Sequence, residues 1–531
     1  MFAFFPSVAR RTLLALGACA LATPAAAADA LSVRAMLERE NVEFARQNVG
    51  TERMRDGYRA RGYAPIWVEG TDLTPRGIEL VNGLARAYED GLAPTDYLNR
   101  IAGFTDVATR EDATRLELAM TDVFLEMGQD LYSGMTTPSV TASDIVIRKK
   151  RVDWGQWMQL AARDGVRETY RRLRPNHPQY AQLRQMLQGY RTLMIKGGWK
   201  PVTAGPTLEP GDTDLRVAQV RRNLRARGYD QVGAATGATY DATLAEAVRH
   251  FQERHGLVVD GLVGPGTVAA LNVPASERVR QLAVNLERWR WLPRNLGRRH
   301  VLVNQAAFEL FLKDGDRTVD NRRVIVGKPY HKTPIFSDSM VYAEFNPTWT
   351  IPRSILGKEM LPKIRRNPQY LNDKGYTLYT SWKRKAKPVS PFAVDWSSVS
   401  AKRFPYRVVQ GPGPQNALGR VKFIFPNKFA VYMHDTPSRN LFSRTERAFS
   451  HGCIRVHEPL DFAAKLFALQ GGMEPAAIPA LVASKRTRRV NLDRKLPVHL
   501  AYFTAWVDER GVPQFYDDVY GRDRMVARFL F

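Results

Sequence analysis

The chain has 531 residues, 44% of them hydrophobic, and carries 78 Lys and Arg against 53 Asp and Glu, a formal net charge of +25. This excess of positive charge indicates a polyanionic neighbour, and nucleic acid is the default partner for such a chain. No run of about 20 apolar residues follows the N-terminal region, so we expect a soluble or peripheral mature protein. The roughly 500 remaining residues exceed what one hydrophobic core organises, so we expect two to four domains.

The first residues have the composition of a secretory signal peptide. Arg10 and Arg11 precede an apolar run at 13–21, and a string of small residues ends at Ala28. We therefore expect residues 1–28 to be removed after export to the periplasm. Export argues against nucleic acid and favours murein carboxylates or an anionic envelope surface as the polyanion, with peripheral envelope association.

Cysteine usage adds a second indication. Of two cysteines, Cys19 lies in the signal region and Cys453 stays in the mature chain. A single exposed thiol in an oxidising compartment oxidises or forms mixed disulfides, so its presence predicts chemistry there. Two alternatives stay open for the N-terminus. Residues 16–19 loosely resemble a lipoprotein cleavage box, which would anchor the chain through Cys19, and the apolar run can also be a buried helix.

Residues 31–205 have mostly helical periodicity. Apolar side chains recur at helical spacing in 78–85, 116–125 and 180–194, and the Gly197-Gly198 pair ends the last stretch. No cluster of titratable groups with evident chemistry stands out, so we expect a helical scaffold domain.

A small domain is expected at residues 212–273, after a Gly/Pro-rich linker. Two helical stripes alternate with Gly/Asp turns in this stretch. Its residues Tyr240-Asp241, Phe251-Gln252 and His255 to Leu257, followed by Asp260-Gly261, resemble the small three-helix peptidoglycan-binding module. The resemblance implies murein binding, and a pure spacer role stays open. His250 and His255 are expected on the helix surface. Residues 276–298 are expected to form a linking helix.

From residue 299 to 531 the period changes to two, which indicates many short strands and a β-rich domain closer to a sandwich or rolled sheet than to a papain-like fold. Val498 to Val507 and Gln514 to Tyr516 are expected to close the sheet. The strand pattern lapses over 353–406, a stretch too long for a plain loop, so we expect a capping subdomain or lid there.

The stretch 449–457 contains the only cysteine expected in the mature chain, and its residues are candidates for a nucleophile and its neighbours. Cys453, Arg455 and His457 alternate with two aliphatic residues, so a short strand would place the three polar side chains on one face. Gly452, directly before the thiol, lets the backbone approach a substrate carbonyl.

A second strand, Phe429 to His434, ends 19 residues before Cys453. If the two strands are neighbours, His434 is the base for the thiol, and the N–H groups of Gly452 and Cys453 are candidate oxyanion donors. Two alternatives stay open. A lone cysteine is often a small buried hydrophobe, and a zinc site is conceivable on ligand chemistry from Cys453, His434, His451 and His457.

Residues 450–456, together with 432–437, closely resemble the active-site signature of the L,D-transpeptidases, the YkuD-type cysteine enzymes of the bacterial cell wall. Residues 89–98, 190–199 and 285–293 are similar to the large multidomain members. The resemblance implies a β-sandwich catalytic fold and a base oriented by the backbone carbonyl of Asp435. The expected organisation is an α+β multidomain chain with a helical scaffold, a three-helix peptidoglycan-binding domain and a β-sandwich catalytic domain with an inserted cap.

By the same resemblance, the donor is a murein stem tetrapeptide that loses its terminal D-alanine, and the amine of a second stem captures the acyl group as a 3→3 cross-link. Carbapenems are expected to acylate Cys453, and no metal or organic cofactor is needed. Beyond the nucleophile and base, we place substrate contacts at Arg455, His451, Tyr432 and Trp349.

Three other functions remain open at this point. An L,D-carboxypeptidase, or an enzyme that attaches an envelope protein to murein, would use the same residues with a different acceptor. A non-catalytic murein anchor would need only the binding module and the basic surface. Loss of Cys453 distinguishes the anchor from the enzymes.

Overall fold

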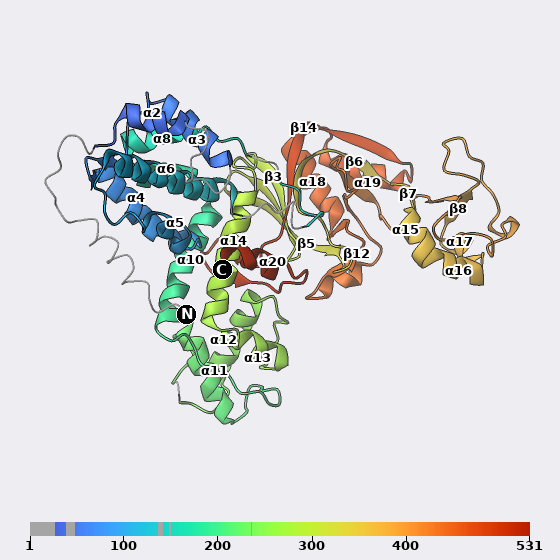
Figure 1. Cartoon of the computed structure of the whole chain (residues 1–531). Helices are drawn as coiled ribbons and strands as arrows, with labels where there is room; N and C mark the ends of the chain where they lie inside the picture. The colour runs from blue at the N-terminus through green and yellow to red at the C-terminus, as the bar shows by residue number, and fades with distance from the viewer. Residues whose placement is uncertain (1–26, 39–47, 136–141, 148–149, 235) are drawn as a thin grey trace. The chain divides into compact units, whose positions relative to one another are not determined.

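The computed structural model describes residues 27–38, 48–135, 142–147, 150–234 and 236–531, without the side chains of 48–51 (Figure 1). The expected signal peptide, apart from its last two residues, and Cys19 lie outside this part. The described residues form two compact units. The first contains those before 142, between 148 and 294, and from 504 onward; the second contains 142–147 and 295–503.

Helices dominate the N-terminal part of the first unit, as the periodicity predicts. The long helix α6 is the centre of their core, and a capping box between Thr109 and Asp112 begins it. Its buried Glu117 accepts hydrogen bonds from the backbone N–H groups of residues 66–68, which fixes the preceding loop on the helix. The elements are α2 (Ala30–Glu38), α3 (Asn48–Arg59), β1 (Val68–Glu69), β2 (Asp72–Leu73), α4 (Pro75–Ala85), η2 (Ala87–Asp90), α5 (Pro94–Ile101), α6 (Arg110–Ser133), α8 (Trp154–Asp164), α9 (Val166–Leu173) and α10 (Pro178–Ile195).

The small domain follows with its own hydrophobic core. It contains α11 (Leu215–Ala226), α12 (Ala242–Arg254) and α13 (Pro265–Leu271), and α14 (Ala275–Trp291) comes next. The Gln252 side chain bonds to Asp260, to the Leu262 carbonyl and to the Gly261 N–H, which holds the Gly/Asp turn against α12. The expectation that His255 lies on the surface is wrong, because its ring stacks on Phe251 and is 8% exposed.

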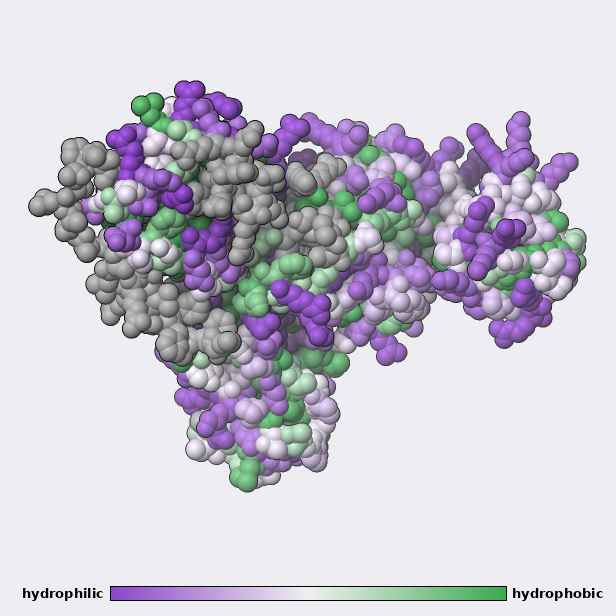
Figure 2. All heavy atoms as spheres, in the orientation of Figure 1, coloured by the Kyte–Doolittle hydropathy of each residue, from purple (hydrophilic) through white to green (hydrophobic). Residues whose placement is uncertain are grey.

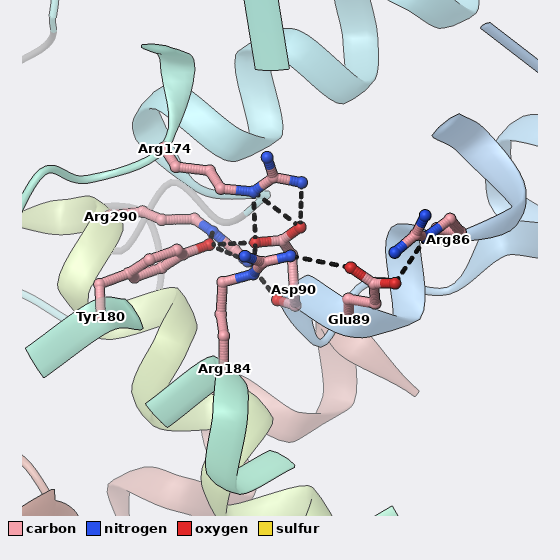
Figure 3. Close-up of polar contacts among 7 residues, drawn as sticks. All are labelled: Arg86, Glu89, Asp90, Arg174, Tyr180, Arg184 and Arg290. Atoms are coloured by element: carbon pink, nitrogen blue, oxygen red, sulfur yellow. Dashed lines mark hydrogen bonds and ion pairs between the residues drawn. The ribbon is translucent and has the colours of Figure 1, made fainter. Parts of the chain in front are cut away.

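A buried ionic cluster joins η2, α9, α10 and α14 in the first unit (Figure 3). Asp90 is fully buried and receives Arg174 at 2.7 Å and Arg184 at 2.7 Å. Arg290, also fully buried, donates to Glu287 at 2.9 Å and to the Tyr180 hydroxyl at 3.0 Å. Each buried guanidinium here has an oxygen partner, so the cluster stabilises the packing of helices distant in sequence.

The second unit is built on one sheet of nine strands among its described residues. The strand order is β12-β5-β13-β11-β10-β6-β14-β3-β4, and an additional β4–β5 pairing closes the sheet on itself. The expected β-rich domain is therefore a rolled sheet. Its strands are β3 (Arg299–Asn304), β4 (Glu309–Asp314), β5 (Arg317–Gly327), β6 (Phe336–Phe345), β10 (Val421–Ile424), β11 (Met433–His434), β12 (Ala448–Ser450), β13 (Ile454–Val456) and β14 (Arg488–Ala501).

Short helices accompany this sheet. They are η5 (Arg439–Ser443), α18 (Pro459–Gln470), η6 (Pro475–Ala477) and α19 (Ile478–Ala483). The predicted strand from Phe429 to His434 is only partly correct, because regular pairing begins at Met433. The Asn427 side chain accepts from the N–H groups of Phe429 and Val431 and folds the earlier residues into a loop.

Residues 349–410 form a subdomain with its own hydrophobic cluster. They enter and leave through the paired strands β7 (Trp349–Thr350) and β9 (Arg407–Gln410), and β8 (Tyr376–Tyr379) completes the sheet. Its helices are α15 (Arg353–Ile355), η3 (Leu356–Met360), α16 (Leu361–Arg366), α17 (Tyr370–Asp373) and η4 (Pro391–Ala393). We call residues 349–410 the cap.

The C-terminal strands correct one expectation. β15 (Ala505–Val507) and β16 (Pro513–Phe515) pair only with each other among the described residues, and with α20 (Arg522–Leu530) they belong to the first unit. Thr504 explains the change of course: it is fully buried, its N–H donates to Asn285 of α14, and its hydroxyl donates to Asp523. Strands β15 and β16 therefore do not close the nine-stranded sheet, contrary to the expectation from the sequence.

Two surface properties accompany this fold. Hydrophilic side chains are spread over the face shown in Figure 2, in keeping with the high net charge. Within the described ranges, every helix is too short or too polar to cross a bilayer.

Candidate active site

The rolled sheet brings the two predicted motifs together. Strands β11 and β13 are parallel neighbours with His434 opposite Arg455, and the Ile454 N–H donates to the Tyr432 carbonyl at 3.0 Å. Because side chains alternate along a strand, Tyr432 and His434 emerge on the same face as Cys453 and Arg455. The separation of 19 residues in sequence thus becomes a contact between adjacent strands.

His434 has the environment of a neutral base. It is 5% exposed, and its Nδ1 lies 2.5 Å from the backbone carbonyl of Asp435, so Nδ1–H is the donor and Nε2 keeps a free lone pair. Burial, followed by the nearby charges of Arg455 and Lys422, lowers the pKa of His434 to about 3. The imidazole is therefore uncharged at neutral pH and able to accept a proton. Asp435 orients it through the main chain, as the resemblance implies.

The Asp435 carboxylate has a different role. Its Oδ2 accepts from the N–H and the Nε of Arg420, both at 2.9 Å, and its Oδ1 accepts from the Thr436 N–H at 2.8 Å. A Cβ at Gly419 would lie 2.4 Å from this side chain, so only glycine leaves room for it. Asp435 holds the loop in place and is not a triad aspartate.

Cys453 is a partly exposed thiol with polar neighbours. Its sulfur lies 4.0 Å from the Ala430 carbonyl and receives hydrogen bonds from the N–H and the hydroxyl of Tyr432. Burial raises the pKa of the Cys453 thiol, although Tyr432 and Arg455 partly offset the increase. The resting site therefore pairs a protonated thiol with a neutral imidazole. In the described structure His434 shares the face with the sulfur without a direct hydrogen bond to it.

Arg455 supplies positive charge beside the sulfur. It is half-buried, and its Nε has no hydrogen-bond partner within the described residues. Burial lowers the pKa of Arg455, and the neighbouring Cys453 opposes that effect. A guanidinium with an unused donor on the nucleophile's face is suited to a thiolate or a substrate carboxylate.

The turn that presents Cys453 is fixed by hydroxyl groups that sequence reasoning missed. Gly452 has φ +111°, a conformation that favours glycine. Its N–H donates to Ser450 Oγ at 3.0 Å, Ser450 Oγ donates to the Cys453 carbonyl at 2.5 Å, and Thr333 Oγ1 donates to the Gly452 carbonyl at 3.0 Å. The Gly452 N–H is therefore engaged by Ser450 in this structure, and its oxyanion role stays a prediction. The Cys453 N–H donates to no other described residue and stays available.

His451 connects the motif to the cap. Its Nε2 lies 2.5 Å from Glu359 Oε1 in η3, and its ring lies 5.1 Å from that of His331. Desolvation and the charge of His451 lower the pKa of His331. The structure thus gives His451 a carboxylate partner that its own sequence neighbourhood did not indicate.

Trp349 lies beside the environment of Cys453, whereas His457 does not. Trp349, at the neck of the cap, donates a side-chain hydrogen bond to Tyr432, which places it beside the Cys453 environment. His457 lies 5.0 Å from Phe442, ring to ring, and does not join the group. Across the described ranges, no three His, Cys, Asp or Glu side chains cluster as a metal site requires, so the geometry gives no support to the zinc alternative.

Comparison with known families matches three segments of the chain. Residues 298–468 match "L,D-transpeptidase catalytic domain", residues 213–271 match "Putative peptidoglycan binding domain", and residues 52–187 match "Scaffold domain". The catalytic match contains Cys453 and His434 and also the cap.

Two curated relatives are similar to parts of this chain, and the first carries the same family name as the catalytic match. A protein of Haemophilus influenzae named "Putative L,D-transpeptidase" is 34% identical over 258 residues, 48% of this chain and 51% of the relative. An N-acetylmuramoyl-L-alanine amidase, CwlM of Mycobacterium tuberculosis, is 39% identical over 75 residues, 13% of this chain and 18% of that protein. The chain thus spans about half the length of the first relative and less of the second.

One solved structure is also similar. An L,D-transpeptidase from Xylanimonas cellulosilytica is 15% identical, with 57% of this chain and 100% of that chain covered and a TM-score of 0.17. At that score it adds no argument about the fold.

Proposed function

We propose that the protein is a murein L,D-transpeptidase that forms 3→3 cross-links between stem peptides through a thioester on Cys453, and the match of residues 298–468 to an L,D-transpeptidase catalytic domain supports this. The observation that carries the proposal is the placement of Cys453, His434 and Arg455 on one face of two adjacent parallel strands. The match of residues 213–271 to a peptidoglycan-binding domain supports the same substrate.

The first half-reaction is acylation. His434 Nε2 accepts the thiol proton, and Cys453 Sγ attacks the carbonyl carbon of the third residue of the donor tetrapeptide. The Cys453 N–H stabilises the oxyanion. When the amide bond to the terminal D-alanine breaks, the leaving amine takes the proton from His434. The products are free D-alanine and a thioester between Cys453 and the tripeptide.

The neutral resting state suits this step. Because the pKa of His434 is lowered to about 3 and that of the thiol is raised, proton transfer is unfavourable until a substrate is bound. Arg455 stabilises the thiolate as it forms, since its positive charge acts on Cys453 and opposes the increase in the thiol pKa. This arrangement limits oxidation of the thiol in the absence of a donor peptide.

The second half-reaction transfers the acyl group. The side-chain amine of an acceptor stem attacks the thioester carbonyl, its proton passes to His434, and the thiol is restored. Water competes with the amine for the thioester, so the cap has to limit access of solvent. The His451–Glu359 contact joins the cap to the turn that carries Cys453. We therefore expect it to influence whether water or the acceptor amine attacks the thioester.

Donor recognition uses the remaining residues of the site. We assign a donor carboxylate to Arg455 and contacts with the peptide to Tyr432, Trp349 and His451. Carbapenems, which carry a strained amide carbonyl and a carboxylate, are expected to acylate Cys453 in the same way. Residues 10–28 and the location of murein support a periplasmic site of action, and N-terminal sequencing of the exported protein tests it, with Asp29 expected as the first residue.

Product analysis tests the reaction. The full chain is incubated with a purified disaccharide-tetrapeptide, and the products are separated by chromatography and identified by mass spectrometry. The proposal predicts a 3→3 dimer and free D-alanine in equal amounts. Formation of tripeptide alone would show that the protein is a carboxypeptidase. If no product forms, even when an amine acceptor is added, acyl transfer is refuted.

A further inference from the structure

Three arginines of the first unit converge beside the small three-helix domain. Arg227 directly follows α11, Arg254 ends α12 and Arg278 lies in α14; α12 and α14 are labelled in Figure 1. All three act electrostatically on Tyr190 of α10 and on His255. The cluster therefore extends beyond residues 213–271, since α10 and α14 contribute Tyr190 and Arg278.

Arg227 is held in place without a counter-ion. Its guanidinium lies 3.6 Å from the centre of the Trp199 ring. Its Nε donates to Asn223 Oδ1 at 2.9 Å and its Nη2 to the Leu271 carbonyl at 2.6 Å. Its Nη1 is buried and has no partner among the described residues. The rest of the side chain is thus rigidly positioned around one unused donor.

Arg278 and His255 repeat this pattern. Arg278 is 6% exposed, lies 4.5 Å over the Phe515 ring and donates to Gln281 at 2.7 Å, while its Nε has no described partner. His255 is 8% exposed, and its Nδ1 lies 2.7 Å from the Phe251 carbonyl. His255 Nε2 is also without a partner in the described structure, and it carries a lone pair because Nδ1 holds the proton.

No carboxylate of the described residues forms an ion pair with these three arginines, and only the exposed Asp517 acts on Arg278 from a distance. Burial lowers the pKa of Arg227 to about 9 and that of Arg278 to about 10. Buried positive charge without a counter-ion destabilises a fold. The cluster therefore lacks an anion that would balance it.

The buried cluster of Figure 3 shows how the same unit treats an arginine with a structural role. Arg290 is fully buried, but Glu287, Tyr180 and the Asp90 carbonyl supply oxygen acceptors for it. Arg227 and Arg278 have amide and carbonyl acceptors but no carboxylate partner; each lies over an aromatic ring, and each keeps one nitrogen without an acceptor among the described residues. Aromatic faces orient guanidinium planes and leave the N–H edges for a ligand.

We propose that Arg227, Arg254 and Arg278 form a receptor for an oxyanion, and that the ligand is a carboxylate of a murein stem peptide. That source rests on the proposed function, whereas the oxyanion site does not. The His255 lone pair requires a hydrogen-bond donor, which the N–H of a peptide supplies and the phosphodiester of a phospholipid or nucleic acid does not. The site anchors the strand that the catalytic domain processes.

A binding measurement on the full chain tests the proposal. The Cys453→Ala variant prevents turnover, and a fluorescent disaccharide-tetrapeptide is titrated by anisotropy. Arg278→Gln and Arg227→Gln are each expected to weaken binding at least ~10-fold, as loss of a hydrogen bond to a charged group does. The matched control is Arg225→Gln, an exposed arginine of α11 whose contact is the Gly233 carbonyl. It is expected to bind like the parent.

Ligand variants identify the anion. Amidation of the peptide carboxylates is expected to weaken binding as strongly as Arg278→Gln does, and inorganic phosphate is expected to compete only weakly. Equal binding of the amidated ligand refutes the oxyanion receptor. Stronger competition by phosphate, or tight binding to vesicles of anionic phospholipid that Arg278→Gln abolishes, refutes the murein carboxylate as the ligand.

Thermal denaturation separates binding from folding. Because Arg278→Gln removes an uncompensated charge, its melting temperature without ligand is expected to equal or exceed that of the parent, and the rise on adding ligand is lost. A lower melting temperature with unchanged affinity shows a structural role and overturns the proposal. The nucleophile is absent from this assay, so failure of cross-linking and failure of binding are distinguishable.

Discussion

The cluster around Asp90 and the face around Cys453 are both assemblies of buried polar side chains, but they balance their charges differently. Around Asp90, the arginines and Tyr180 converge on a fully buried carboxylate (Figure 3). Around Cys453, the Nε of Arg455 lacks a partner within the described chain. The first arrangement stabilises one structure, whereas the second leaves groups for a substrate to complete.

The difference shows that the pairing of a buried polar group indicates whether its role is structural or chemical. Complete pairing makes a polar group necessary for folding and inert in chemistry. Incomplete pairing, combined with partial exposure of a thiol, costs stability and provides reactivity. Mutations in the two regions should therefore separate cleanly into effects on stability and effects on rate.

The largest effect is expected from Cys453→Ala. Removal of the nucleophile should lower the transfer rate by more than ~10⁴-fold, the scale seen when a covalent catalyst is deleted. The melting temperature should change little, because the thiol is partly exposed and sulfur makes only weak hydrogen bonds to Tyr432 and Ala430. Rates are measured as D-alanine release. An unfolded variant would contradict the separation of the two regions.

The next largest effect is expected from His434→Gln. Glutamine occupies a similar volume but accepts no proton, so the acylation rate should fall by ~10²–10⁴-fold, the usual contribution of a general base. Binding of the donor peptide should remain. Stopped-flow measurement of carbapenem acylation checks the rate. Equal rates in the variant and the parent would show that another group is the base.

Asp90→Asn should act only on stability. Arg174 and Arg184 lose their shared carboxylate, and breaking a buried ion pair of this kind costs ~3–5 kcal/mol. Urea denaturation measures the loss, and the rate per folded molecule should not change. The control is Glu89→Gln at the rim of the same cluster, where contacts with Arg86 and Arg184 are more exposed and the cost should stay below ~1 kcal/mol.

The pH dependence of thiol alkylation tests whether Cys453 is a protonated thiol in the resting site. The raised pKa of Cys453 leaves less thiolate at pH 7 than in a free cysteine peptide, so iodoacetamide should react more slowly at that pH. The rate should then increase tenfold per pH unit and continue to increase above the range where free cysteine ionises. A rate that is already constant from pH 5 to 8 would indicate a resting thiolate–imidazolium pair.

The smallest effect is expected from Glu359→Gln in the cap. It weakens the half-exposed contact with His451, so acylation should change less than ~10-fold. If the contact helps the cap exclude water, the ratio of hydrolysis to cross-linking should increase. Quantitative muropeptide chromatography gives the ratio. An unchanged ratio would assign the contact to surface stability alone.

Much of the site was predictable because it depends on local patterns. Alternation around Cys453 and the His434 strand ending predicted one shared face, and the resemblance predicted the Asp435 carbonyl as the orienting group. The hydrogen bond from the Gly452 N–H to the Ser450 hydroxyl was not predicted, because it depends on how the turn folds back on itself. Glu359 reaches His451 from 92 residues away, and no pattern near either residue indicates such a contact.

The fold shows the same division. Helical periodicity and the change to period two located the scaffold, the small domain and the β-rich domain. The course of the C-terminal strands was not predictable, because it depends on the buried Thr504 and its bonds to Asn285 and Asp523. The burial of His255 likewise depends on a residue distant in sequence, Phe515, whose ring lies 5.7 Å away.

The most direct measurement is the intact mass of the full chain during incubation with a stem tetrapeptide donor and no acceptor. If Cys453 is the acyl carrier, the wild-type protein should gain the mass of one tripeptide acyl group, and digestion should locate it on Cys453. The Cys453→Ala variant should gain nothing. An adduct on another residue, or release of D-alanine by the variant at the wild-type rate, would contradict a reaction through this thiol.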